Sequence, residues 1–186
     1  KQVNPNYNEN MNLRLLANGS NKESSISFGK NEVTLEAKDL TVPFVYTPYH
    51  ATNMEKPVIQ VTVEGTYRKL PVFDLTTEQS EFNQTWNLTN GYGLVKGNRF
   101  QTLFPEENKT QATNSNLRSV VQMYDNDILG KYDEWIGLSP DASNPIHKSS
   151  PRRYFFKADA NGVGALYYGG AWAANTSSSA APWLGD

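Results

Sequence analysis

The chain has 186 residues, a formal net charge of −2 and no cysteine. A weakly acidic chain has no overall attraction to phosphate backbones or anionic lipid, so we expect neither a nucleic-acid partner nor a membrane-surface role. The lack of cysteine excludes a disulfide framework and any cysteine-ligated metal. No segment approaches the roughly 20 apolar residues of a membrane span. Hydrophobic residues make up 38% of the chain, enough for a sizeable core.

The first part of the chain shows the alternation that is typical of strands. β-branched and apolar residues fall on one face in each of three segments, with Asn, Gly, Lys and Pro between them. These predicted strands are residues 11–16, 33–37 and 58–63, and residues 92–95 and 99–104 are further candidates. Short strands at this spacing predict an antiparallel β-sandwich, jelly-roll-like in its connections.

Helical spacing appears later in the chain. A short helix is predicted over residues 77–86, where Phe82 and Trp86 are four residues apart. The polar residues 106–116 lack periodicity and predict a linker or surface loop, so we place a domain boundary near Thr110. We therefore expect a sandwich domain over residues 1–110 and a second, partial domain over residues 111–186.

The clearest predicted helix follows that linker. Its apolar residues recur every three or four positions, Ser115 or Asn116 can cap its start, and Gly137 can take the left-handed closing position. The apolar residues are Leu117, Val120, Val121, Tyr124, Ile128, Tyr132 and Trp135. An extended loop over residues 138–152 and a buried strand over residues 154–156 come next. Strands followed by a helix make the predicted fold class α+β.

Few residues in the chain suit catalysis or metal binding. The only two histidines, His50 and His147, lie in proline-flanked loops, which favours surface histidines over metal ligands. Residues 159–162 resemble the start of a calcium loop but lack the later acidic ligand, so a tight turn is favoured. A carboxylate cluster on the predicted helix is best explained as a solvated face, because Asp125 and Asp127 point about 200° apart there. The other members of that cluster are Asp133 and Glu134.

Aromatic residues and glycines are concentrated near the end of the chain. Tyr167, Tyr168 and Trp172 suit a stacking platform for sugars or peptide, with glycines that let a ligand approach the backbone. Packing between two subdomains explains the same residues equally well. We take these three residues and the nearby Asn175 as candidates for a substrate cleft, and no residue as catalytic or metal-binding.

A spaced set of residues resembles the first part of enhancin-like zinc metallopeptidases, a family of viral enhancins and bacterial mucin-degrading enzymes. The strongest match is Tyr154-Phe155-Phe156-Lys157-Ala158-Asp159, followed by Gly164-Ala165, Tyr167-Tyr168-Gly169 and Trp172. Weaker matches precede it in order: Val42-Pro43-Phe44, Leu70-Pro71, Phe82 with Trp86, Asn98-Arg99-Phe100 and Tyr132-Asp133-Glu134 with Gly137. Together they cover most of residues 11–184.

The resemblance implies a β-sandwich that leads into a mostly helical catalytic region with a zinc-binding His-Glu-x-x-His helix. Its two histidines hold the ion and its Glu deprotonates a zinc-bound water for attack on a peptide carbonyl. This chain contains no such motif, so the resemblance implies that the motif follows shortly after residue 186 in a longer parent. Zinc is expected in that parent and no cofactor in this fragment.

The resemblance predicts a non-catalytic portion of a secreted or cell-surface zinc endopeptidase that acts on mucin-like glycoproteins. Its expected partners are a glycoprotein or glycan substrate and the rest of the catalytic domain. The alternatives are a carbohydrate-binding module without catalysis and a structural or adhesive domain in which the aromatic rings are simply core.

Overall fold

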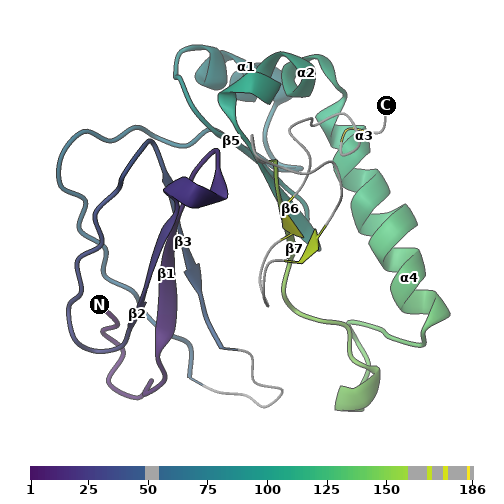
Figure 1. Cartoon of the computed structure of the whole chain (residues 1–186). Coiled ribbons are helices and arrows are strands. Elements are labelled where there is room, and N and C mark those ends of the chain that lie inside the picture. Colours follow the sequence, from purple (N-terminus) through teal and green to yellow (C-terminus); the bar gives the residue numbers. More distant parts are fainter. Residues whose placement is uncertain (49–54, 159–166, 169–173, 176–183, 185–186) are drawn as a thin grey trace. The chain divides into compact units, whose positions relative to one another are not determined.

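The structure is a computed structural model that describes residues 1–48, 55–158, 167–168, 174–175 and 184. Figure 1 shows its elements along the chain. Contacts between residues divide the chain into two compact units, Lys1–Lys69 and Leu70–Asp186. The two units are considered separately below.

The first unit is built on one antiparallel sheet of three strands. The strands are β1 (Met11–Leu16), β2 (Ser24–Phe28) and β3 (Val42–Tyr46), in the order β2-β1-β3, and a single 3₁₀ turn, η1 (Ser20–Lys22), joins β1 to β2. The predicted strand over residues 11–16 is confirmed. Its burial explains its place at the centre of the sheet, because Met11, Leu15 and Leu16 are all buried. Tyr7, Met11 and Phe28 form the small core on which the sheet packs.

Two other predicted strands in this unit are wrong. Residues 33–37 have no strand, and residues 58–63 have only a single bridge between Gln2 and Ile59. The valines that suggested the second strand are exposed: Val58 by 54%, Val61 by 61% and Val63 by 55%. A strand needs a partner and a buried face as well as β-branched residues, and this segment lacks the buried face.

The second unit contains a mixed sheet of six described strands. Their order is β4-β5-β6-β7-β9-β8, with β5·β6 and β8·β9 antiparallel and the other pairs parallel. The bounds are β4 (Val72–Phe73), β5 (Gly93–Lys96), β6 (Phe100–Phe104), β7 (Tyr154–Lys157), β8 (Tyr167–Tyr168) and β9 (Ala174–Asn175). The predicted strands near residues 92–95, 99–104 and 154–156 are therefore confirmed.

The second unit also contains helices. They are α1 (Gln79–Asn87), α2 (Lys109–Asn114), α3 (Leu117–Gln122), a π-helical segment η3 (Met123–Ile128), α4 (Leu129–Trp135), and the 3₁₀ turns η2 (Glu106–Asn108) and η4 (Pro145–His147). The predicted helix over residues 117–135 is confirmed as the continuous run α3–η3–α4, the long helix in Figure 1. Asn116 caps it by accepting a hydrogen bond from the Ser119 N–H, and Gly137 follows it at φ 76°.

The predicted linker over residues 106–116 is wrong, because η2 and α2 occupy most of it. Ala112 is fully buried in the core of the second unit. The α1 amides hold the end of α2: Asn83 Nδ2 donates to the Thr113 carbonyl at 3.0 Å, and Gln79 Nε2 donates to the Ser115 carbonyl at 2.6 Å. Polar residues here are helix caps and ties between helices, which a polarity pattern does not distinguish from a loop.

The core of the second unit is centred on Trp86, which is fully buried. Its ring lies 5.4 Å from that of Phe82, and Phe82 meets Phe73 edge-to-face at 5.7 Å. Trp86 Nε1 donates to the Gly91 carbonyl at 3.1 Å, so its one polar atom is satisfied. A Cβ on Gly93 would come within 2.7 Å of the Trp86 ring. Strand β5 therefore needs glycine at that point to lie flat on the ring.

The predicted α+β class is confirmed, but the predicted sandwich is not: the described residues form one three-stranded and one six-stranded sheet, with no closed barrel. The structural division at Lys69 falls earlier than the boundary expected near Thr110, because α1, β5 and β6 belong to the second unit. The domain limits 1–110 and 111–186 stay a prediction. Within the described residues, no helix is both long and apolar enough to cross a membrane.

Truncation of the central ring tests this core. Trp86→Ala should lower the free energy of unfolding by about 3–5 kcal/mol, because it empties a fully buried ring site. Leu88→Ala, two residues further along at the C-cap of α1, where the side chain is 81% exposed, should change it by less than about 0.5 kcal/mol. Urea unfolding of both variants measures the difference, and equal losses would contradict the assigned core.

Candidate substrate-facing site

Three of the four candidate cleft residues lie together at one end of the large sheet. Tyr167 and Tyr168 form β8, the last strand in the order of the described strands, and Asn175 belongs to its neighbour β9. The register pairs Tyr167 with Asn175 and Tyr168 with Ala174. Trp172, the fourth candidate, lies outside the described residues. The structure thus brings Tyr167, Tyr168 and Asn175 onto two paired strands.

Strand β7 connects this end of the sheet to the core. It pairs in parallel with β6 on one side and with β9 on the other, where Lys157 is opposite Asn175. Phe155 and Lys157 are buried, and Lys157 is completely so. Sequence reasoning did not single out Lys157. The available signal was a lysine that directly follows three aromatic residues of a predicted buried strand, since lysine is rarely buried without a partner.

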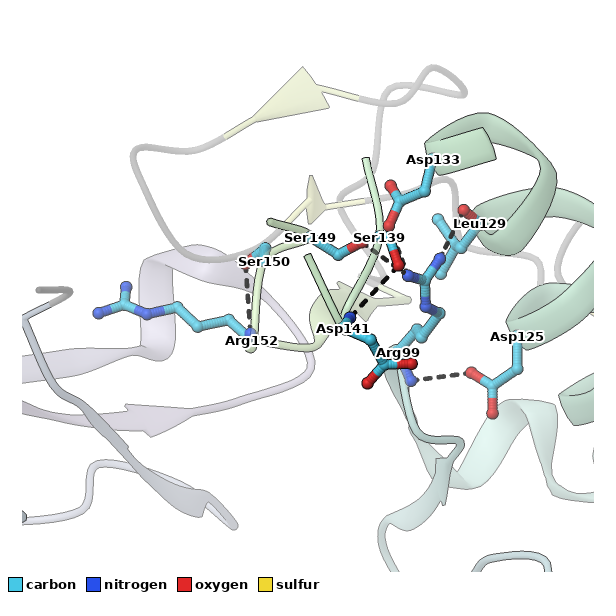
Figure 2. Close-up of polar contacts among 9 residues, drawn as sticks. All are labelled: Arg99, Asp125, Leu129, Asp133, Ser139, Asp141, Ser149, Ser150 and Arg152. Atoms are coloured by element: carbon cyan, nitrogen blue, oxygen red, sulfur yellow. Dashed lines mark hydrogen bonds and ion pairs between the residues drawn. The ribbon is translucent and has the colours of Figure 1, made fainter. Parts of the chain in front are cut away.

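A polar network fixes the β5–β6 hairpin to the long helix (Figure 2). The carboxylate of Asp125 accepts hydrogen bonds from the backbone N–H groups of Asn98 at 2.7 Å and Arg99 at 2.8 Å, and Figure 2 shows the second of these bonds. The Arg99 guanidinium donates to the Leu129 carbonyl at 2.7 Å and to Ser149 Oγ at 3.2 Å, and it pairs with the Asp133 carboxylate. We call these residues, Asn98, Arg99, Asp125, Leu129, Asp133 and Ser149, the Arg99 network.

The Arg99 network corrects the expectation of a solvated carboxylate face. Asp125 is 93% buried, and the Asp133 side chain is 16% exposed because of its arginine partner. Asp127 and Glu134 do face solvent, and Glu134 pairs with Lys131 at 2.7 Å. Asp125 is buried whereas Asp127 is exposed, in keeping with the opposite directions that helical spacing gives them. The prediction failed for Asp125 and Asp133 because arginines and backbone N–H groups distant in sequence cannot be placed from helical spacing alone.

Close approach of the backbone to Asp125 is a further requirement of this network. A Cβ on Gly97 would lie 2.6 Å from the Asp125 carboxylate oxygens, so only glycine admits the carboxylate there. The π-helical segment Met123–Ile128 contains Asp125. π-helical turns often occur at functional positions, and here the turn brings a carboxylate to the hairpin. Every member contributes to a hydrogen bond or ion pair within the network, so the network suits positioning.

A small cavity of about 140 Å³ lies beside the hairpin turn, with Gly97 and Asn98 in its lining. Its lining includes Asp74, Lys96 and Arg153. Arg153 Nε donates to the Gly97 carbonyl at 2.7 Å, and Lys96 Nζ is 3.5 Å from Asp74. The hydrogen bond from the Thr76 hydroxyl, aided by the Thr76 N–H, the Thr77 hydroxyl and Lys96, lowers the pKa of Asp74 to about 2.

The histidines do not contribute to a metal site in the described part of the chain. His147 is exposed in η4, where its carbonyl accepts a hydrogen bond from the Ser139 N–H. His50 and the calcium-like turn at residues 159–162 lie outside the described residues. No group of three or more histidine, aspartate or glutamate side chains among the described residues is arranged to hold an ion.

Removal of the carboxylate at Asp125 should destabilise the second unit. Asp125→Ala leaves the N–H groups of Asn98 and Arg99 without their acceptor, at a cost of about 2–4 kcal/mol in the free energy of unfolding. Asp127→Ala, in the same helical segment but exposed, should cost less than about 0.5 kcal/mol. Chemical denaturation gives both values. A loss at Asp125 no larger than at Asp127 would contradict the network.

The depressed pKa of Asp74 predicts a pH dependence. A carboxylate whose folded pKa lies near 2, below its ordinary value of 3.8, contributes stability above the ordinary value that disappears as pH falls toward 2. Asp74→Asn should therefore flatten the loss of stability between pH 4 and pH 2. Thermal unfolding across that range measures it, and an unchanged slope would show that Asp74 does not titrate as described.

Sequence comparison relates nearly the whole chain to two viral proteins. No protein-family model matches the chain. Viral-enhancing factor of Pseudalatia unipuncta granulosis virus is 30% identical over 180 residues, which cover 92% of this chain and 19% of that protein. Viral-enhancing factor of Heliothis armigera granulosis virus is 29% identical, again over 92% of this chain and 19% of that protein. The chain thus spans about a fifth of the length of the curated relatives that it matches.

Solved structures share the fold. A conserved Bacillus anthracis protein of unknown function matches with a TM-score of 0.62 and 14% identity, over 92% of this chain and 35% of that one. The catalytic module of the metalloprotease ZmpA from Clostridium perfringens matches with a TM-score of 0.57 and 12% identity, over 99% of this chain and 44% of that one.

A third solved structure contains a sugar. The M60 catalytic domain of Clostridium perfringens ZmpC, solved with the sialyl T antigen, matches with a TM-score of 0.53 and 11% identity, over 92% of this chain and 41% of that one. Identities this low establish a shared fold only. The sequence match to the viral-enhancing factors and the fold shared with the metalloprotease modules agree with each other over nearly the whole chain. The chain is therefore a homologue of part of the viral-enhancing factors, and it shares its fold with part of the metalloprotease modules.

Proposed function

We propose that this chain is the non-catalytic scaffold segment of a secreted zinc metalloendopeptidase that acts on mucin-like glycoproteins. The observation that carries the proposal is the 30% identity to a viral-enhancing factor along 92% of the chain. The fold likeness to a metalloprotease catalytic module, over 99% of the chain, supports it independently. A relative solved with the sialyl T antigen supports a glycan-bearing substrate.

Zinc chemistry does not fit the residues of this chain. A zinc peptidase site needs two histidines one helical turn apart and a third ligand, whereas this chain has only His50 and His147, far apart in sequence. No described cluster of acidic residues and histidine replaces them. Under the proposal, both the zinc ligands and the general base belong to a further part of the parent protein.

The contribution of this chain is a cleft wall at the β8 end of the large sheet. Strand β8 is paired with β9 on one side and is last in the order of the described strands. The last strand of a sheet can offer backbone N–H and C=O groups to an extended peptide, which adds to the sheet as a further strand. Tyr167, Tyr168, Trp172 and Asn175 are residue types that stack on sugar rings and donate hydrogen bonds to them.

The Arg99 network gives this wall a rigid support. It ties β6 to the long helix, and β6 pairs with β7, which in turn pairs with β9. A binding surface built on strands that are fixed in this way keeps its geometry better than one built on loops.

Enzyme assays on two forms of the protein test the proposal. Purified 1–186 with added zinc should not cleave mucin, whereas the longer protein encoded by the same gene should cleave it and lose activity to a chelator. In the longer protein, Tyr168→Ala should raise KM for a glycosylated peptide more than it lowers kcat, because the residue binds substrate without entering the chemistry.

Two results would contradict the proposal. Mucin cleavage by 1–186 itself would place the chemistry in this chain. Glycan binding by 1–186, combined with a longer protein that has no peptidase activity, would instead favour the carbohydrate-binding module.

A further inference from the structure

The long helix runs beyond the core that buries its first half. Leu117 and Val121 are fully buried, and Val120 and Tyr124 are each less than 10% exposed. Further along, Ile128 is 38% exposed, Tyr132 62%, Trp135 77% and Ile136 62%. No residue of α4 is buried. The predicted apolar stripe is therefore real, but only its first half packs within the second unit.

The four exposed side chains lie on one side of the helix. Ile128, Tyr132 and Ile136 are spaced four residues apart, and Trp135 is three residues from Tyr132, so all of them fall on one stripe. The rings of Tyr132 and Trp135 are in contact, with centroids 6.3 Å apart. We call these four residues the α4 patch. An exposed cluster of large apolar side chains on a soluble domain marks an interaction surface.

The orientation of the α4 patch is fixed by the Arg99 network. Arg99 holds the Leu129 carbonyl and the Asp133 carboxylate, both on α4. Asp133 lies on the helix face opposite to Trp135, about 200° around the axis. The clamp therefore turns Asp133 toward the hairpin and Trp135 away from it. Figure 2 shows Asp133 and Leu129 of α4 meeting the Arg99 side chain. The clamp thus holds the turns of helix that contain Tyr132 and Trp135.

We infer that the α4 patch is the seat for another part of the same polypeptide, within the larger catalytic module of an enhancin-like protein. This inference rests on the proposed function. The argument for this occupant is length: the segment that matches this chain is 44% of the ZmpA catalytic module by fold and 19% of the viral relative by sequence. Most of each related protein lies outside the matched segment and is available to cover such a face.

The composition of the patch favours polypeptide over sugar. Sugar platforms depend on the flat faces of aromatic rings, whereas half of this patch is isoleucine, and its two rings are inclined by 46° to each other. Aliphatic side chains beside aromatic ones are typical of a helix–helix or helix–sheet contact that continues a core. The buried first half of the same stripe is such a contact.

Thermal unfolding of matched variants tests the inference. Trp135→Asp should leave the Tm of 1–186 unchanged, because the side chain is already in water, but should lower the Tm of the longer protein by roughly 4 °C or more. Leu88→Asp, at a similarly exposed side chain of 81%, should change neither Tm. No effect of Trp135→Asp in either form would overturn the inference.

Hydroxyl-radical footprinting of the unmodified proteins provides a second measurement. Trp135 should oxidise readily in 1–186 and severalfold more slowly in the longer protein, while the fully buried Trp86 stays protected in both. Equal oxidation of Trp135 in both forms would contradict the inference. A gene that encodes only these 186 residues would also overturn it.

Other occupants of the patch give other results. Dimers of 1–186 that Trp135→Asp converts to monomers would make the occupant a second copy of the chain. Binding of a Tn-bearing glycopeptide to 1–186 that Trp135→Asp abolishes would make it a sugar. Either result would overturn the inference. Peptidase activity, measured separately, distinguishes the two proposals: a protected Trp135 in an inactive longer protein would contradict the proposed function and leave this inference standing.

Discussion

The hydrogen bonds between the Asp125 carboxylate and the β5–β6 hairpin are the interaction on which the second unit depends. A buried carboxylate is costly unless its oxygens are hydrogen-bonded, and here the backbone N–H groups of Asn98 and Arg99 supply those bonds. The same two residues place the Arg99 side chain against α4. A single turn of chain thus fixes the sheet, the helix and the loop that contains Ser149 relative to one another.

Two surfaces of the second unit follow from that arrangement. Strand β6, held by the Arg99 network, positions β7 and β9, and through them the β8 end of the sheet. The clamped α4 exposes its apolar patch, with Trp135 on the side away from Arg99. One surface suits an extended peptide and the other suits packing against more protein. Both fit a scaffold that works as part of a larger enzyme.

Local patterns in the sequence predicted the elements whose stability is local or strongly periodic. The helix with its Asn116 cap and Gly137 terminus, and the strands Phe100–Phe104 and Tyr154–Lys157, combine hydrophobic period with capping or burial signals. The predictions failed where contacts with distant residues, and not the local pattern of polar and apolar residues, determine the secondary structure. The valines of residues 58–63 alternate like a strand but remain exposed, and the polar residues around Ala112 form helix because α1 supplies their hydrogen bonds.

The candidate site was partly accessible to sequence reasoning for a related reason. Residue types alone indicated Tyr167, Tyr168 and Asn175, but their pairing on neighbouring strands required the structure. The Arg99 network joins residues up to 50 positions apart in the sequence. The spacing of residues within one helix or strand cannot predict contacts between residues so far apart. Helical periodicity predicted the apolar stripe that contains Trp135, and only the structure revealed which half of that stripe is buried.

The central claim is that this chain supplies support and cleft wall while the zinc chemistry lies elsewhere in the parent protein. Elemental analysis of zinc in dialysed samples of 1–186 and of the longer protein tests it most directly. The account predicts one zinc ion per molecule of the longer protein and none per molecule of 1–186. Stoichiometric zinc in 1–186, or none in the longer protein, would contradict it.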